Sequence, residues 1–320
     1  MRGVILAAGR GTRLAPLTDP WPKPLAPLAG VPALARVMTR LRDSGITEIG
    51  VNAFHRAECM QAYLGQEEGK DRSPPVQLRI EPEIQGTLGG VVGFRPWLGD
   101  HSALVHNGDI ATDLPLGDLM GAHRAAVARA RTGGRSLALT MALIQNPSTD
   151  SVCVDGDGWV RRFERGAPRS ATFSGISIMT PALLERHEPN RPADFVPSIE
   201  AAMDDGLLVA AWLAPETTQW TDFGTPWRYW DLHRRIARNE ATAIATAPPS
   251  GWQVSADAQR EPRVILEGWG WLGAGAKVGA GARLRDTIVW PHTRVEPGED
   301  LEAAILTPWA RVEINPHDAS

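Results

Sequence analysis

The beginning of the chain places a short apolar run directly before a glycine-rich turn. Gly3–Ala8 is apolar and ends at Gly9. Such a run is too short for a buried helix, and its position predicts the first strand of a parallel sheet. Gly9 and Gly11 can take positive φ and have no side chain, so a phosphate could approach the backbone N–H groups of residues 10–13 closely. This segment therefore predicts an anion-binding turn after a sheet strand.

Two cations follow the turn. Arg13 carries a guanidinium, and Lys23 stands between Pro22 and Pro24, which restrict the backbone and so direct the lysine side chain. N–H donors, a guanidinium and an ammonium fit a polyphosphate better than a neutral ligand. Taken alone, however, the glycines are equally consistent with a simple tight turn between a strand and a helix.

Two common phosphate-binding motifs are disfavoured. Leu14 stands where the dinucleotide fingerprint has its third glycine, which argues against a Rossmann dehydrogenase. The chain contains no GxxxxGK[ST] run, which argues against the P-loop NTPases.

Helical and strand patterns alternate after the turn. Apolar residues recur at helical spacing over residues 34–41, strand patterns cover 46–53 and 76–81, and a short helix is expected over 57–64 between them. This alternation predicts a doubly wound, mostly parallel, Rossmann-like α/β sheet. Ligands of such sheets bind beyond the carboxyl ends of the strands, where the glycine-rich turn is expected.

The segments LAAGRGTRLAPLT and PKPLAPLAGVP together resemble the signature of the sugar-1-phosphate nucleotidyltransferases. The resemblance implies an enzyme that uses a nucleoside triphosphate and a sugar 1-phosphate, with Mg²⁺, to make a nucleotide sugar and pyrophosphate. It also implies that Arg13, Lys23 and Asp109 are catalytic.

A second glycine-rich segment, residues 81–90, is similar to the base-recognition loop of this family. Gln85 stands where that pattern has Leu, and Leu88 stands where it has Ala or Gly. The residues alone also fit a plain helix entry with glycines for close packing. The resemblance implies nucleotide contacts from both loops, namely Leu6, Ala7, Ala8, Gly9, Gly11, Thr12, Arg13, Lys23, Gln85, Gly86, Thr87, Asn107 and Gly108.

Two aspartates are expected to hold the metal. Asp109 follows the predicted strand 102–105 in the sequence Asn-Gly-Asp, and a carboxylate there suits Mg²⁺ that bridges phosphates. Asp113 fits better as the cap of the next helix, and His106 is expected to be structural. Asp222 lies in the WTDFGTP segment, which matches the family's W-x-D-x-G-T-P, and the resemblance makes it the second metal ligand. Its alternative role as a helix cap suits Thr225 better, because proline follows.

The expected sugar-phosphate site draws on three segments. Residues 152–155 and 159–163 form a predicted hairpin followed by Glu164-Arg165-Gly166, where the family commonly has Glu-Lys-Pro. Arg165 is either a replacement for that lysine or a solvated arginine. The residues expected near the sugar phosphate are Glu164, Arg165, Ser174, Gly175 and Trp220. Gly175 interrupts a strand, which indicates a close approach of ligand or backbone, and Trp220 is alternatively a packing residue.

The C-terminal region has a six-residue repeat of aliphatic residues from Leu266 to Val312. The repeat predicts a left-handed parallel β-helix of fewer than three coils. The expected organisation is a nucleotidyltransferase domain over residues 1–244, a linker rich in Ala, Pro and Ser over 245–262, and the β-helix over 263–320. So short a β-helix needs a neighbour to cover its faces, which predicts packing on the first domain or a homo-oligomer.

Composition limits the remaining possibilities. With 320 residues and a formal net charge of -4, the chain has no basic footprint for a nucleic-acid polymer. The N-terminal apolar run is too short for a signal peptide or membrane span, so no membrane association and a cytoplasmic location are expected. Cys59 and Cys153 lack the spacing of a zinc site or disulfide framework.

The predicted substrates are GTP and mannose 1-phosphate, because the base loop and the C-terminal repeat together resemble the guanylyltransferases of the family. The alternative within the family is an N-acetylmuramate-1-phosphate uridylyltransferase or another hexose-1-phosphate enzyme. The alternative of another class is a non-catalytic nucleotide-sugar-binding regulatory subunit.

Overall fold

The computed structural model describes residues 1–68, 76–146, 149, 151–167, 170–245 and 251–315, which pack as two units. Unit 1 comprises residues 1–9, 37–110 and 114–220, and unit 2 comprises residues 10–36, 111–113 and 221–320. The domain boundary predicted at residues 245–262 was based on composition. The observed packing divides the chain differently, because residues 10–36 belong to the same unit as the C-terminal part of the chain. Helix α1 (Ala33–Asp43) begins in unit 2 and ends in unit 1.

Unit 1 is built on a mixed sheet whose first half is parallel. The order β5-β4-β1-β6 is parallel, β11 runs antiparallel to both β6 and β8, and β12 is parallel to β8. The strands of the sheet are β1 (Arg2–Leu6), β4 (Ile49–Ala53), β5 (Val76–Ile80), β6 (Ala103–Asn107), β8 (Leu137–Ile144), β9 (Val152–Val154), β10 (Val160–Phe163), β11 (Ser170–Met179) and β12 (Leu208–Leu213). The predicted parallel-rich α/β sheet is confirmed, and so is the β9–β10 hairpin, which is antiparallel.

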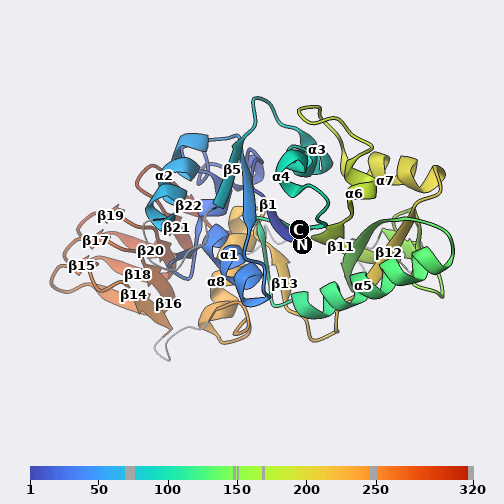
Figure 1. Ribbon diagram of the computed structural model, residues 1–320. Coiled ribbons are helices and arrows are strands. Elements are labelled where there is room, and N and C mark those ends of the chain that lie inside the picture. Colours follow the sequence, from blue (N-terminus) through green and yellow to red (C-terminus); the bar gives the residue numbers. More distant parts are fainter. Residues whose placement is uncertain (69–75, 147–148, 150, 168–169, 246–250, 316–320) are drawn as a thin grey trace. The chain divides into compact units, whose positions relative to one another are not determined.

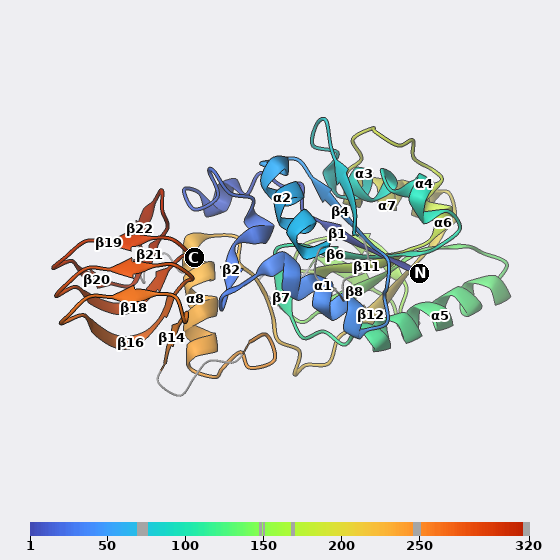
Figure 2. The ribbon, with the colours of Figure 1, turned by 60° about the vertical axis from the view of Figure 1, so that its left-hand side comes forward.

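Helices cover both faces of this sheet. Helices α3 (Gly86–Val92), α4 (Arg95–Leu98), α6 (Pro181–Leu184) and α7 (Phe195–Asp204) lie on one face, and α5 (Leu116–Thr132) lies along β8 and β12 on the other (Figures 1 and 2). Helix α2 (Ala57–Glu68) follows β4 and contacts β5. Helix α5 begins after Pro115 and has no side-chain cap, so the expected capping role of Asp113 is wrong.

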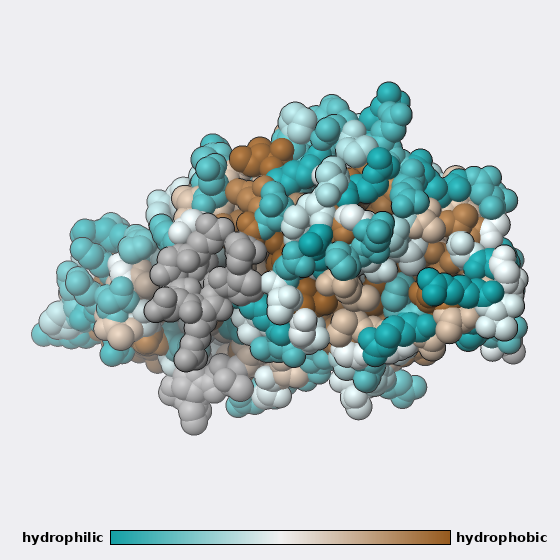
Figure 3. All heavy atoms as spheres, in the orientation of Figure 1, coloured by the Kyte–Doolittle hydropathy of each residue, from teal (hydrophilic) through white to brown (hydrophobic). Residues whose placement is uncertain are grey.

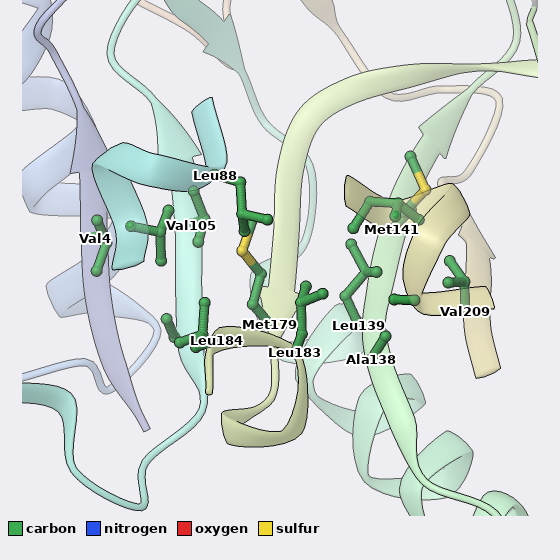
Figure 4. Packing of buried hydrophobic residues seen from close by; sticks show 14 of the residues in the cluster. Val4, Leu88, Val105, Ala138, Leu139, Met141, Met179, Leu183, Leu184 and Val209 are labelled. Carbon is green, nitrogen blue, oxygen red and sulfur yellow. The ribbon is translucent and has the colours of Figure 1, made fainter. Parts of the chain in front are cut away.

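The core of unit 1 forms where the sheet meets α3 and α6. Val4, Val105, Met179 and Leu139 project from β1, β6, β11 and β8 toward Leu88 and the α6 leucines (Figure 4). All of these side chains are at most 2% exposed. Burial of this apolar face fixes the register of the strands, because a shift of the register by one residue would turn the buried side chains outward.

Unit 2 contains two ladders of short, stacked strands. In one ladder Trp252 lies opposite Gly270, Gly270 opposite Thr287 and Ile288 opposite Ile305, always in parallel. The strands of the first ladder are β14 (Trp252–Val254), β16 (Ile265–Leu272), β18 (Arg283–Val289), β20 (Asp300–Glu302), β21 (Ala304–Leu306) and the antiparallel β22 (Arg311–Glu313), and those of the second are β15 (Gln259–Arg260), β17 (Lys277–Val278) and β19 (Arg294–Val295). Figure 2 shows the strands stacked beside α8 (Pro226–Ala237).

The six-residue repeat marks the interior of these ladders. The repeat residues Leu272, Val278, Leu284, Val289 and Val295 are buried together in one cluster. The handedness of the coil stays a prediction, and residues 316–320 of the predicted β-helix lie outside the described residues.

Part of the predicted linker is not a linker. Within residues 245–262, the strands β14 and β15 pair in parallel with β16 and β17 and so add to the stack. Composition hid this, because the segment lacks the aliphatic repeat. Trp252 instead packs where a Cβ on Gly270 would lie only 2.3 Å from the indole ring. The stack is therefore longer than the repeat alone predicted, and residues 246–250 lie outside the described residues.

Helix α8 joins the stacked strands to the N-terminal loop within unit 2. Tyr229 is buried between Phe223 and Trp290, with ring centroids 6.3 and 6.1 Å away, and Trp271 packs over the backbone of Gly30. Gly30 has φ 75°, and a Cβ there would lie 2.3 Å from the Trp271 ring. Thr225 caps the helix by accepting a hydrogen bond from the Arg228 N–H at 3.3 Å, as predicted.

Buried polar side chains hold the loop against α8. His233 Nδ1 lies 2.9 Å from the Tyr229 carbonyl, and its Nε2 accepts the Ala29 N–H at 3.2 Å. Arg36 donates to the carbonyl of Leu28 at 2.7 and 2.9 Å and to that of Ile244 at 3.2 Å, and burial lowers its pKa. The His233 ring is neutral in this arrangement, since a protonated Nε2 would oppose an N–H donor.

The surface shown in Figure 3 is mostly hydrophilic, with apolar residues in separate groups. None of the helices in the described part of the chain has the length and apolar character needed to cross a bilayer.

We predict that acid destabilises the protein through its buried histidines. Burial lowers the pKa of His106, His123 and His233 from 6.5 to about 4. Between these values the unfolded chain binds protons that the native state does not, so stability falls as the pH falls from about 6.5 to 4. Each histidine contributes at most about 1.4 kcal/mol per pH unit. Denaturant unfolding measured at pH 7, 6 and 5 should give this slope on top of that of the carboxyl groups.

Comparison with a variant isolates one histidine. His233→Gln should flatten the slope by about 1.4 kcal/mol per pH unit, whereas the exposed His101→Gln should leave it unchanged. Equal slopes for all three proteins would contradict a neutral, buried His233.

Candidate functional site

The carboxyl ends of β1 and β6 bring Leu6, just before the first predicted loop, beside the Asn-Gly-Asp segment. Leu6 lies opposite Asn107 in the parallel register, and the Gly108 N–H donates to the Leu6 carbonyl at 2.9 Å. Asp109 is half-buried in the turn between β6 and β7 (Ile110–Thr112). Parallel pairing therefore places the predicted nucleotide residues of these two segments side by side in unit 1.

The interruption of β11 lies against the same segment. Gly175 has φ 79°, and a Cβ there would lie 2.9 Å from Asn107 Nδ2. The register of β11 against β8 shifts between Phe173 and Ser177, as expected where a glycine breaks a strand. The predicted close approach at Gly175 is thus an approach of the Asn107 side chain.

Trp220 is tied to this break. Its indole Nε1 donates to the Ser174 carbonyl at 2.8 Å, while the buried Ser174 Oγ donates to the Ala142 carbonyl at 2.7 Å. Asn107, Ser174, Gly175 and Trp220 therefore form one connected group in unit 1. The packing role considered for Trp220 and a place in the candidate site are compatible.

Glu164 and Arg165 lie in the turn that leads from β10 toward β11. Both are exposed, and Glu164 forms an ion pair with Arg162 at 2.7 Å. The hairpin pairs with Ser170 and Ala171, the part of β11 that extends past the carboxyl end of β6. The two residues are therefore on the ligand side of the sheet.

The second glycine-rich loop is a helix entry held by backbone contacts. The N–H groups of Leu88 and Gly89 donate to the Ala193 carbonyl, both at 3.1 Å, and the Ala193 N–H donates to the Gln85 carbonyl at 2.8 Å. Gly86 has φ 72°, and a Cβ there would meet the Ala193 carbonyl oxygen at 2.8 Å. The close-packing explanation for these glycines is correct.

Gln85 departs from the base-loop pattern and has an unusual environment. The residue is fully buried, and its Nε2 donates to the Glu83 carbonyl at 3.4 Å. Within the described residues, its Oε1 has no hydrogen-bond partner. Because a buried acceptor is costly to leave unpaired, this atom is suited to accept a hydrogen bond from a ligand.

The anion-binding turn forms in unit 2. Gly11 takes the left-handed conformation with φ 68°, whereas Gly9 does not. Gly11 precedes a 3₁₀ turn over Thr12–Leu14, and its carbonyl accepts the Thr18 hydroxyl at 2.8 Å. A Cβ on Gly11 would lie 3.2 Å from the Lys23 Cβ, so glycine is needed here both for its φ and for the approach of Lys23.

Lys23 and Arg13 meet the segment around Asp222. Lys23 is 7% exposed, and its Nζ lies 5.2 Å from the centre of the Phe223 ring. A Cβ on Gly224 would lie 3.2 Å from the Arg13 guanidinium, so Gly224 allows that guanidinium to lie against the backbone. The cations and the WTDFGTP segment, far apart in sequence, are thus neighbours in unit 2.

Asp222 has a partner that sequence reasoning missed. It ends β13 (Trp220–Asp222) and forms an ion pair with Arg228, in the first turn of α8. The signal was present in the sequence, because Thr225-Pro226 fixes the helix start and so places Arg228 near the preceding strand. A cation bound at Asp222 would have to share the carboxylate with Arg228.

The predicted residues thus fall into two groups, one in each unit. Unit 1 holds Asp109, and unit 2 holds Asp222. In the described part of the chain no group of three or more His, Cys, Asp or Glu side chains is placed to hold a metal. His106 is fully buried, with Nδ1 2.7 Å from the Asn107 carbonyl, in keeping with the structural role expected for it.

The profile of the nucleotidyl transferase family matches residues 2–239. A mannose-1-phosphate guanylyltransferase of Mycobacterium tuberculosis is 26% identical over 306 residues, which cover 93% of this chain and 82% of the relative. An N-acetylmuramate alpha-1-phosphate uridylyltransferase of Neisseria meningitidis is 31% identical over 233 residues, which cover 70% of this chain and 94% of the relative.

Solved structures show the same fold. HddC from Yersinia pseudotuberculosis, in complex with GMP-PN, aligns with a TM-score of 0.55 at 21% identity and covers 72% of this chain and 97% of its own. This likeness concerns the fold alone.

We predict that Gly175→Ala destabilises the protein. The substitution forces a side chain into the left-handed region and against Asn107, which should cost about 1–3 kcal/mol of unfolding free energy. Gly156→Ala, in a hairpin turn with open space around its Cβ position, is the matched control. Equal midpoints of urea unfolding for the two variants would contradict the close approach.

Proposed function

The chain belongs to the nucleotidyl transferase family, and from that premise we propose that it transfers a nucleoside monophosphate from a nucleoside triphosphate to a sugar 1-phosphate. The products are a nucleotide sugar and pyrophosphate. The observation that carries the proposal is the convergence of Arg13 and Lys23 on the Asp222–Gly224 segment beside a left-handed Gly11. Two fixed cations beside a turn without side chains suit a triphosphate.

We propose GTP and mannose 1-phosphate as the substrates. The similarity to the mycobacterial guanylyltransferase supports this choice, because it extends over 93% of the chain and thus includes the C-terminal repeat. The second candidate is transfer of uridylate to N-acetylmuramate 1-phosphate, which the higher identity to the neisserial enzyme, 31% over 70% of the chain, favours. We also propose that the repeat region is a left-handed β-helix, which the parallel ladders support. We propose a homo-oligomer as well, because the stack is short.

The proposed reaction is an in-line displacement. An oxygen of the sugar 1-phosphate attacks the α-phosphorus, the bond from that phosphorus to the bridging oxygen breaks, and pyrophosphate leaves. No covalent intermediate on the protein is needed, because alignment and charge neutralisation supply most of the acceleration. Arg13 and the amides of the first loop would hold the β- and γ-phosphates, and Lys23 would neutralise charge at the reacting phosphate.

The remaining residues would bind and orient the substrates. Gln85 offers a buried acceptor to the N–H edge of the base, which guanine and uracil both have. Ser174, Gly175 and Trp220 would line the sugar side, where a glycine leaves room. Arg165 would contact the sugar phosphate in place of the usual lysine.

The donor set fits Mg²⁺. This ion needs only one or two protein carboxylates when phosphates and water complete its shell. Asp109 would hold it, and Asp222 would do so after release from Arg228. When bound, Mg²⁺ supplies positive charge to the phosphate oxygens. As a ligand of that ion, Asp109 would be a catalytic residue.

A regulatory subunit without turnover is the competing proposal. Such a chain would be expected to have lost charged residues of the reaction centre, whereas Arg13, Lys23, Asp109 and Asp222 are all present.

The proposed reaction predicts pyrophosphate release in one substrate combination. Five nucleoside triphosphates should be tested against a panel of sugar 1-phosphates that includes mannose and N-acetylmuramate 1-phosphates. Arg13→Ala and Lys23→Ala should each lower kcat about 100- to 1,000-fold, as loss of one charge-stabilising donor typically does. The exposed Lys277→Ala serves as the control.

Three outcomes separate the alternatives. Turnover with GTP and mannose 1-phosphate supports the first choice of substrates, and turnover with UTP and N-acetylmuramate 1-phosphate supports the second. Nucleotide-sugar binding without pyrophosphate release from any combination would support a regulatory subunit.

The metal assignment predicts how substitutions change the Mg²⁺ dependence of the rate. Asp109→Asn and Asp222→Asn should raise the Mg²⁺ concentration needed for half-maximal rate at least about tenfold, because each loses an anionic ligand. The exposed Asp157→Asn, in a hairpin turn, should behave like wild type. An unchanged Mg²⁺ dependence in either of the first two variants would remove that residue from the metal site.

A further inference from the structure

A buried pair of polar side chains connects Ala7, at the start of the first predicted nucleotide loop, to the second loop within unit 1. Asn52 lies near the end of β4, and Glu81 directly follows β5. The two side chains are 2% and 3% exposed. They lie at the carboxyl ends of β4 and β5, which run parallel to β1, and this is the end of the sheet where ligands of such folds bind.

The hydrogen bonds run unbroken from one loop to the other. Asn52 Oδ1 accepts the Ala7 N–H at 2.6 Å, and Asn52 Nδ2 donates to Glu81 Oε1 at 2.8 Å. Glu81 Oε2 then accepts the Gln85 N–H at 3.1 Å. Ala7 lies just before Gly9 of the first loop, and Glu81 and Gln85 both lie in the second loop, residues 81–90. Asn52 and Glu81, which have no nucleotide or sugar contact in the proposed site, thus join the start of the first loop to the second loop.

The backbone N–H groups of Ala7 and Gln85 determine which side chains can form the pair. A backbone N–H points inward from each loop, so an acceptor is required on both sides. An amide offers one acceptor and one donor, and a carboxylate offers acceptors only, so Asn followed by Glu satisfies every atom in the chain of bonds. The opposite orientation of the Asn52 amide would put its NH₂ against the Ala7 N–H.

Helix α3 closes over the pair. A Cβ on Gly90 would lie 2.7 Å from Asn52 Nδ2 and 3.3 Å from Glu81 Oε1. The guanidinium of Arg79 lies 3.5 Å from Glu81 Oε1. Gly90 is thus required for the approach of α3, the helix that the second loop begins.

Stability alone does not account for this arrangement. Burial of the Glu81 carboxylate costs several kcal/mol of desolvation, which its hydrogen bonds and the ion pair with Arg79 offset, and apolar side chains of similar volume often serve stability as well or better. This desolvation cost arises at the carboxyl end of the sheet, where the positions of the loops determine how a ligand binds. We propose that Asn52 and Glu81 are positioning residues that set the distance between the start of the first loop, at Ala7, and the second loop, and through it the affinity and base selectivity for the nucleoside triphosphate.

This inference rests on the proposed function, because the loops are assigned to triphosphate and base there. A reciprocal exchange tests it. Asn52→Asp alone places two carboxylates face to face, and Glu81→Gln alone leaves one donor opposite another. In the double variant, the carboxylate introduced at position 52 accepts from the Ala7 N–H and from the amide introduced at position 81. The oxygen of that amide accepts the Gln85 N–H, so every hydrogen bond is restored with the direction of the central one reversed.

The expected results separate positioning from mere stability. Each single variant should raise KM for the triphosphate about tenfold or more and weaken the preference for the cognate base, with kcat and KM for the sugar phosphate within about twofold of wild type. The double variant should recover KM to within about threefold. Amide hydrogen exchange should rise in both loops in the single variants and fall again in the double variant.

Thr180→Val is the matched control. Thr180, directly after the end of β11, is 7% exposed and donates to the Leu137 and Ala138 carbonyls at 2.6 and 3.0 Å. Its loss should lower Tm without changing KM for the triphosphate. Single variants that lose Tm but keep KM and base preference, or a folded double variant that recovers neither, would overturn the inference. Wild-type protein inactive on every substrate pair would instead reject the proposed function, and the exchange data would still report whether the two loops are joined.

Discussion

The parallel pairing of β1 with β4 and β6 is the constraint on which the candidate site in unit 1 depends. Parallel strands end at the same edge of a sheet, so a fixed register also fixes which loops meet. Here the register brings Leu6 to Asn107 and Asn52 to the loop that follows β1. The apolar core under the sheet holds that register, because a slip would expose it to water.

Much of the fold could be predicted from periodicity and turn chemistry. The strands and helices expected over residues 3–8, 34–41, 46–53, 57–64 and 76–81 were confirmed as β1, α1, β4, α2 and β5, and Thr225-Pro226 located the start of α8 to the residue. The errors have physical causes. Strands β14 and β15 were taken for linker because Trp252 fills a space over Gly270 that the six-residue aliphatic pattern does not describe. Asp113 was expected to cap α5, but the helix begins at Leu116 after Pro115.

The candidate site was predictable in its residues but not in its connections. Family motifs supplied the positions of Arg13, Lys23, Asp109 and Asp222, and close approaches in the structure explain why glycine occupies positions 11, 175 and 224. The Asp222–Arg228 ion pair and the Asn52–Glu81 pair depend on which side chains meet after folding. The ion pair follows from the start of α8, which Thr225-Pro226 marks in the sequence. Neither spacing nor composition marks the pairing of Asn52 with Glu81, which are 29 residues apart.

The packing of unit 2 also limits how this protein can be divided. One core holds unit 2 together. It contains Leu14 and Leu17, from the loop that carries Arg13 and Lys23, together with Tyr229 on α8 and Trp290 and Ile305 from the stacked strands. A fragment truncated before β14 would leave that core open to water on the side of the missing strands. The C-terminal stack thus supports the N-terminal loop. A substitution of Trp290 would disturb the packing of the loop that carries Lys23, more than two hundred residues earlier in the chain.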